Sequence, residues 1–194
     1  MTMAEELAAA AARHVVDEGM EYGAAKRKAA RGLGGRIELP ANELVEEAVR
    51  EHIALFCAGT QPAELQALRE VALLWMKRLA EFRPHLSGAA WRGTATRLSA
   101  VHLDLYCDDP KAAEIMLINA GVDFDTGALD RPGRREPLNV LTLAAPSPAL
   151  GETVTVHLML HDLDDQRGAL KRDAQGQSWR GDLPALRRLM ETGP

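Results

Sequence analysis

The chain has 194 residues, of which 46% are hydrophobic and 26% are charged. This length and composition suffice for one compact domain, or for a small core with a helical extension, and they exclude a disordered chain. A net charge of −5 excludes a protein that binds nucleic acid over its whole surface, so any anion site must be a local patch.

Three features of the sequence bear on the cellular compartment of the protein. Cys57 and Cys107 lie far apart without metal-like spacing, which is typical of two reduced thiols. No apolar run approaches the ~20 residues of a membrane span, and the Ala-rich start with two early acids differs from a signal peptide. We therefore expect a cytoplasmic protein without membrane contact, and the abundance of Ala and of Arg over Lys fits a bacterium with a GC-rich genome.

Helical patterns fill the first part of the chain. Thr2 followed by Glu5 is a capping-box pattern, and the apolar stripe that follows it predicts a single helix as far as residue 29. Glycines at 32, 34 and 35 would end this helix. A second helix is predicted from Asn42 to about Gly59, and a third from Thr60 to a stop at Pro84.

Farther along, the apolar period changes from about 3.6 to 2, which indicates strands over 100–106, 138–145 and 153–160. Asp109 and Pro110 predict the start of a helix that runs to about residue 120, and a short helix should follow Asp182. The expected fold is α+β, with a helical N-terminal region over 1–60 and, over 61–194, a small mixed sheet with helices on one face.

Alternation on two of the predicted strands brings polar side chains together. His102 and Asp104 share one face of the first strand, opposite its apolar residues, and His157 occupies the polar face of the strand over 153–160. If both strands belong to one sheet, these three side chains converge, and they are the candidate catalytic residues. His161, at the end of its strand, is a lesser candidate for the same site.

Small and basic residues precede the first of these strands. Small side chains let backbone N–H groups approach phosphate oxygens, and arginine neutralises their charge. The candidate phosphate-binding residues are Gly88, Arg92, Gly93, Thr94 and Ser99, with Arg97 as a second source of charge.

These residues resemble the signature of the polymerase-beta-like nucleotidyltransferase superfamily, which has Gly-Ser, a spacer, and then two carboxylates one residue apart on a strand. A third carboxylate lies on a later strand. Gly88-Ala89 corresponds to Gly-Ser, and Ala100 and His102 fall on the two carboxylate positions. In an alternative register, His102 and Asp104 are the pair. His157 lies where the third carboxylate is expected.

The resemblance implies a nucleotide or another phosphorylated ligand, and Mg²⁺ or Mn²⁺ at Asp104 and His102. It also implies, in an active member, the transfer of a nucleoside monophosphate to a hydroxyl group. Because imidazole is a poor ligand for Mg²⁺, the replacement of carboxylates by His and Ala predicts a degenerate active site. The chain is also similar to small bacterial proteins that share a Tyr-Gly-x-Ala-Lys-Arg-Lys-Ala-Ala stretch, here residues 22–30.

Two other interpretations remain open. In one, the sheet is a scaffold and the helical front half binds a protein or nucleic-acid partner through Lys26, Arg27 and Lys28, although such a basic run is commonly a solvated helix face. A transition-metal site of His102, Asp104 and His157 is the third interpretation. No P-loop, His-Glu-x-x-His or Gly-x-Ser-x-Gly motif occurs, which excludes the corresponding enzyme classes.

Overall fold

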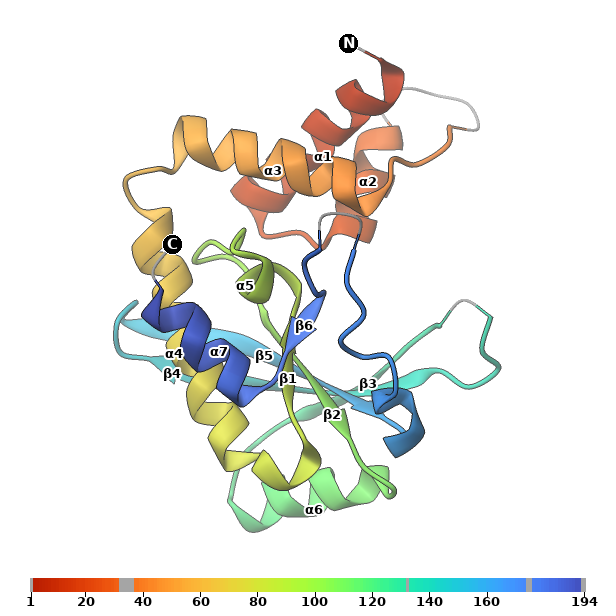
Figure 1. Cartoon of the computed structure of the whole chain (residues 1–194), viewed down its shortest axis with the longest axis vertical. Coiled ribbons are helices and arrows are strands. Elements are labelled where there is room, and N and C mark those ends of the chain that lie inside the picture. Colours follow the sequence, from red (N-terminus) through yellow and green to blue (C-terminus); the bar gives the residue numbers. More distant parts are fainter. Residues whose placement is uncertain (1, 32–36, 132, 174–175, 193–194) are drawn as a thin grey trace. The chain divides into compact units, whose positions relative to one another are not determined.

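The computed structural model describes residues 2–31, 37–131, 133–173 and 176–192 (Figure 1). Contacts within the chain divide it into two units. The first comprises Met1–Leu65 with Thr94–Ser99, and the second comprises Gln66–Gly93 with Ala100–Pro194. The domains predicted over 1–60 and 61–194 stay a prediction.

In the first unit, three helices pack around a small apolar core. They are α1 (Met3–Glu18), α2 (Tyr22–Arg31) and α3 (Asn42–Phe56). The predicted capping box is present, because Thr2 Oγ1 accepts a hydrogen bond from the Glu5 amide at 3.2 Å and the Thr2 amide donates to the Glu5 carboxylate at 2.6 Å. The core is formed mainly by alanine and valine, namely Ala8, Ala11, Ala12, Val15, Val16, Ala25, Val45, Val49 and Ile53.

The single front helix predicted from the sequence is wrong, because two helices occupy that stretch. Gly19 ends α1 in the left-handed region, with φ of 68°, and its amide donates to the His14 carbonyl. A side chain at this position would also bring its Cβ to 2.6 Å from the carbonyl oxygen of Leu98. The predicted stop at glycines 32, 34 and 35 lies outside the described residues.

The remaining elements follow in chain order. They are α4 (Gln61–Arg78), the 3₁₀ helix η1 (Ala80–Phe82), β1 (His85–Ser87), α5 (Gly88–Arg92), β2 (Val101–Tyr106), α6 (Pro110–Asn119), β3 (Asp125–Leu129), β4 (Leu138–Ser147), β5 (Glu152–His161), the 3₁₀ helix η2 (Leu163–Gln166), β6 (Arg180–Gly181) and α7 (Leu183–Glu191). The predicted caps are confirmed, since Asp109 caps α6 and Asp182 caps α7 through their side chains.

Six strands of the described chain form one sheet in the order β3-β4-β5-β2-β1-β6 (Figure 1). β2 and β5 are parallel, and every other neighbouring pair is antiparallel. A mixed sheet combined with helices confirms the predicted α+β class. The sequence did not predict β1, β3, β6 or α5.

One face of the sheet is apolar and buried, as the alternation predicts. On β2, the side chains of Val101, Leu103 and Leu105 are fully buried, and the apolar positions of β5 continue the same layer. This burial fixes the register of β2, because a slip by one residue would turn its polar side chains into the core. No helix in the described residues is long and apolar enough to cross a membrane.

Candidate functional site

The other face of the sheet carries a line of polar residues that are paired from strand to strand. We call this line the polar row; it consists of Asp125, Thr142, His157, His102, Ser87 and Arg180, one from each strand in sheet order. Paired residues of neighbouring strands project from the same face. All of these residues except the exposed Asp125 are half-buried, so a ligand can reach the polar row.

His102 and His157 lie side by side at the centre of the polar row. They are partners in the parallel pairing of β2 with β5, and their ring centroids are 5.2 Å apart. Nδ1 of His157 lies 2.9 Å from Thr142 Oγ1, within hydrogen-bond distance. The structure thus brings together two of the three candidate catalytic residues as the alternation predicts.

Asp104 projects from the same face one pleat farther along β2, but it is buried. His161 Nε2 donates to its Oδ1 at 2.7 Å, and Arg180 Nη1 lies 3.3 Å from its Oδ2. Burial opposes ionisation, yet the hydrogen bond from His161 and the charge of Arg180 outweigh it and hold the pKa of Asp104 below its usual value. Asp104 is therefore an ionised carboxylate whose Oδ1 accepts a hydrogen bond from His161 and whose Oδ2 faces the Arg180 guanidinium.

Arg180 is the residue that sequence reasoning missed. Besides pairing with Asp104, it donates from Nη1 to the Tyr106 hydroxyl at 2.9 Å. The carboxylate of Asp104 raises the pKa of Arg180 against the opposing effect of burial. Arg180 belongs to a strand of only two residues, which leaves no periodic signal in the sequence. Its role depends on pairing between β6 and β1.

The donor set does not fit a magnesium ion. Mg²⁺ prefers several oxygen ligands in octahedral geometry, whereas this site has one carboxylate, already engaged by a guanidinium and an imidazole. Across the described residues, no group of three or more His, Cys, Asp or Glu side chains is arranged to hold a metal ion. The cation beside Asp104 is instead supplied by the protein itself, as Arg180.

Gly88, one of the predicted phosphate-binding residues, directly follows Ser87 of the polar row. It follows β1 with φ of 67°, and a Cβ at this position would lie 3.3 Å from Nδ1 of His102. Glycine thus allows the backbone to turn directly beside the imidazole. The short helix α5 begins at this turn.

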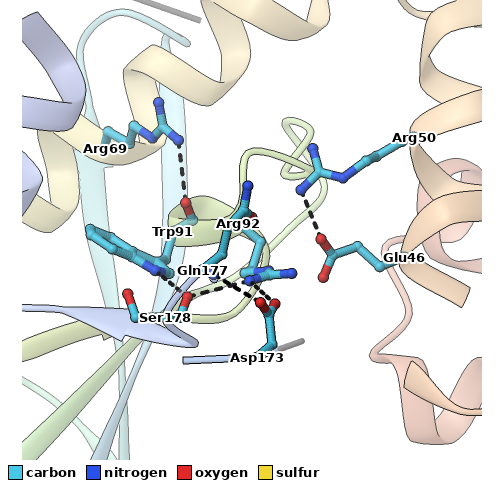
Figure 2. Close-up of polar contacts among 8 residues, drawn as sticks. All are labelled: Glu46, Arg50, Arg69, Trp91, Arg92, Asp173, Gln177 and Ser178. Atoms are coloured by element: carbon cyan, nitrogen blue, oxygen red, sulfur yellow. Dashed lines mark hydrogen bonds and ion pairs between the residues drawn. The ribbon is translucent and has the colours of Figure 1, made fainter. Parts of the chain in front are cut away.

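Arg92 and Trp91 of α5 hold the segment that leads into β6 (Figure 2). Arg92 Nη1 lies 2.9 Å from Asp173 Oδ2 in a buried ion pair, and its guanidinium stacks on Trp179 at 4.4 Å. The Trp91 indole N–H donates to the Ser178 carbonyl at 2.9 Å. Because its charge is compensated by Asp173, Arg92 acts here as an anchor, and its role in phosphate binding stays a prediction.

The other predicted phosphate contacts also have roles within the chain. Gly93 ends α5 with φ of 84°. Thr94 and Ser99 belong to the first contact unit, where Thr94 is buried and the Ser99 hydroxyl accepts a hydrogen bond from the Thr96 amide at 3.0 Å. Their contact with a ligand stays untested.

The basic run on α2 is partly engaged within its own unit. Lys26 donates to the Pro40 carbonyl at 3.0 Å and to Asn42 Oδ1 at 2.8 Å, and Lys28 forms an ion pair with Glu18. These contacts stabilise the fold around α2. Partner binding through Lys26, Arg27 and Lys28 therefore remains only a prediction.

No family model and no curated protein matches the sequence. Among solved structures, the chain is similar to Cid1 poly(U) polymerase with MgGTP bound, at 14% identity over 53% of this chain and 33% of that chain, with a TM-score of 0.35. It is also similar to a cytoplasmic RNA terminal U-transferase, at 17% identity over 57% of this chain and 36% of that chain, with a TM-score of 0.37. The chain thus spans about a third of the length of these proteins, and the residues described above carry the functional argument.

Proposed function

We propose that the polar row binds a nucleotide or another phosphorylated ligand on a nucleotidyltransferase-like fold, and that this binding requires no divalent metal. The observation that carries the proposal is the composition of the polar row between β5 and β6. It presents two imidazoles, a hydroxyl and a guanidinium in sequence across four neighbouring strands. Imidazoles, hydroxyls and guanidinium groups all donate hydrogen bonds to phosphate oxygens.

The charges on this face support an anionic ligand. Asp104 is a buried carboxylate one pleat along β2 from the polar row, and the ion pair with Arg180 and the hydrogen bond from His161 compensate its charge. Asp125, the one carboxylate that belongs to the polar row, lies on the far edge strand, three strands from His102. A phosphate at the His102–His157 pair therefore meets donors rather than an uncompensated negative charge.

The same geometry disfavours metal-dependent nucleotidyl transfer. That chemistry uses carboxylates to hold the ions that bridge the phosphates. Here imidazoles occupy the central positions, and the remaining carboxylate is engaged by Arg180. We therefore expect ligand binding to persist when metal is removed.

Isothermal titration with each of the four ribonucleoside triphosphates and with inorganic triphosphate, in EDTA and again with Mg²⁺, tests the proposal. We expect heat of binding in EDTA with at least one probe, and at least tenfold weaker binding in His102→Gln and in Arg180→Gln. His14→Gln, the same substitution on α1, is the matched control and should bind as the wild type does. Absence of heat with every probe overturns the proposal, and binding that requires Mg²⁺ overturns its metal-free part.

A further inference from the structure

Two matched segments build the centre of the polar row. β2 contains Val101-His102-Leu103-Asp104-Leu105, and β5 contains Val156-His157-Leu158-Met159-Leu160. The strands run parallel, and the pairing aligns the two segments residue by residue, with His102 opposite His157. Each histidine is held between two buried apolar side chains of its own strand, so both rings project from the same face.

The two rings have different surroundings on their Nδ1 side. Nδ1 of His157 lies beside the hydroxyl of Thr142, and Nδ1 of His102 is buried next to the Gly88 turn. A ring held at one nitrogen exchanges protons with a ligand through the other nitrogen. For His157, whose Nδ1 lies beside the Thr142 hydroxyl, that other nitrogen is Nε2.

We propose that His102 and His157 form an acid–base pair that cleaves a phosphodiester carrying a neighbouring 2′-hydroxyl group, that is, a ribonucleotide linkage, without a metal ion. This inference rests on the proposed binding of a phosphorylated ligand. The centroid separation of 5.2 Å places the two imidazoles at a distance that a phosphate group can bridge. One imidazole enters the reaction neutral and the other protonated.

The reaction balances within the ligand and the two rings. The neutral imidazole takes the proton of the 2′-hydroxyl while O2′ attacks phosphorus, and the protonated imidazole gives its proton to the departing O5′. The P–O2′ bond forms and the P–O5′ bond breaks, which yields a 2′,3′-cyclic phosphate and a 5′-hydroxyl. The two rings end with their protonation states exchanged, and no water, metal or redox partner takes part.

Arg180 supplies guanidinium N–H donors on the same face, with its charge compensated by Asp104. The ion pair with Asp104 and the hydrogen bond to Tyr106 hold its guanidinium one pleat from His102 along the sheet. Hydrogen-bond donors held in place beside a phosphate favour the charge that develops there in the transition state. In this reaction, side chains of the protein take the role that a metal ion has in other phosphoryl-transfer sites.

Incubation of the protein in EDTA with the dinucleotide UpA and with a labelled oligoribonucleotide tests the inference, and an oligodeoxyribonucleotide of the same sequence is the matched non-substrate. We expect cyclic-phosphate products from both ribonucleotide probes and none from the deoxyribonucleotide. His102→Gln and His157→Gln should each lower the rate by about 100-fold or more, and His14→Gln should leave it unchanged. In the wild type, the rate should show a bell-shaped dependence on pH, with one limb altered in each variant.

A milder pair of variants guards against loss of folding. Thr142→Val removes the hydroxyl beside His157 Nδ1, whereas Thr155→Val changes an exposed residue of β5 and should behave as the wild type does. We expect Thr142→Val to shift the pH profile of cleavage, a readout that a purely structural role would not move. An unshifted profile in this variant overturns the orientation of His157 that the inference assigns.

Other outcomes separate this inference from the proposed function. Cleavage that is unchanged in His102→Gln and His157→Gln comes from a contaminant and overturns the inference, as does equal cleavage of the deoxyribonucleotide. Nucleotide binding without any cyclic-phosphate product overturns the inference but leaves the proposed function standing. Absence of nucleotide binding overturns both the inference and the proposed function.

Discussion

The contact between β6 and α5 leads to a sharp prediction about Gly181. A Cβ added at this position would lie 2.1 Å from Cη2 and 2.3 Å from Cζ3 of Trp91, far inside ordinary carbon–carbon contact of about 3.5 Å or more. The indole must therefore move by more than about 1 Å to accept Gly181→Ala. That movement breaks the hydrogen bond from Trp91 Nε1 to the Ser178 carbonyl, which measures 2.9 Å.

The cost follows from two contributions. Overpacking in a well-packed site costs about 1–3 kcal/mol, and loss of the Trp91 hydrogen bond adds about 1 kcal/mol. We expect Gly181→Ala to lower the free energy of unfolding by about 2–4 kcal/mol. Because β6 carries Arg180, the same change should also weaken nucleotide binding in EDTA.

Urea unfolding followed by circular dichroism measures this effect. Gly59→Ala is the matched control, since an added Cβ there meets nothing within 4 Å, and it should change the free energy of unfolding by less than about 0.5 kcal/mol. In the background of Trp91→Ala, which removes the ring, Gly181→Ala should cost much less than it does in the wild type. Equal stability of Gly181→Ala and the wild type would refute the packing argument.

Three further predictions concern charges and helix ends. The folded-state pKa of Asp104 is lowered, so its contribution to stability is present above its ordinary pKa of about 3.9 and is lost as pH falls through the folded value. In urea at pH 7, Asp104→Asn should lower the free energy of unfolding by about 2 kcal/mol. A difference from the wild type that does not shrink below pH 4 contradicts this prediction. Arg92→Met removes the ion pair of the buried Asp173 carboxylate and should lower the free energy of unfolding by about 3 kcal/mol. The double variant Arg92→Met with Asp173→Leu should recover most of the thermal stability. If calorimetry shows no recovery, the ion pair does not stabilise the fold as argued. Asp182→Ala removes the hydrogen bond of 2.9 Å from the Ala185 amide, which caps α7. It should lower the free energy of unfolding in urea by about 1 kcal/mol, and a loss below about 0.3 kcal/mol would count against the cap.

Local sequence rules were sufficient wherever neighbouring residues decide the structure. The alternation in β2 separates the buried Val101 and Leu103 from the half-buried His102, although Asp104, on the same face as His102, is buried as well. The side chains of Asp109 and Asp182 cap α6 and α7 because an N-cap bonds to an amide only two or three residues away. These features depend on residues that are close together in the chain, so they can be predicted from the sequence.

The apolar periodicity of the N-terminal region predicted one helix where the structure has two. The apolar stripe continues across Gly19 in the sequence, yet Gly19 adopts the left-handed conformation and ends α1. Apolar periodicity alone does not report such a break, because glycine fits either a helix interior or a helix end. The close approach to the Leu98 carbonyl, which favours glycine there, joins residues far apart in the chain.

The amino-acid sequence by itself determined the α+β class, the polar face of β2 and the candidates His102, Asp104 and His157. Only the tertiary structure decided what these residues do, because β2 and β5 are more than forty residues apart and their pairing sets His102 against His157. The tertiary structure also brought Arg180, on a strand of two residues, to Asp104. An ion pair between side chains so distant in the chain depends on strand pairing and burial, and no local pattern of residues encodes it.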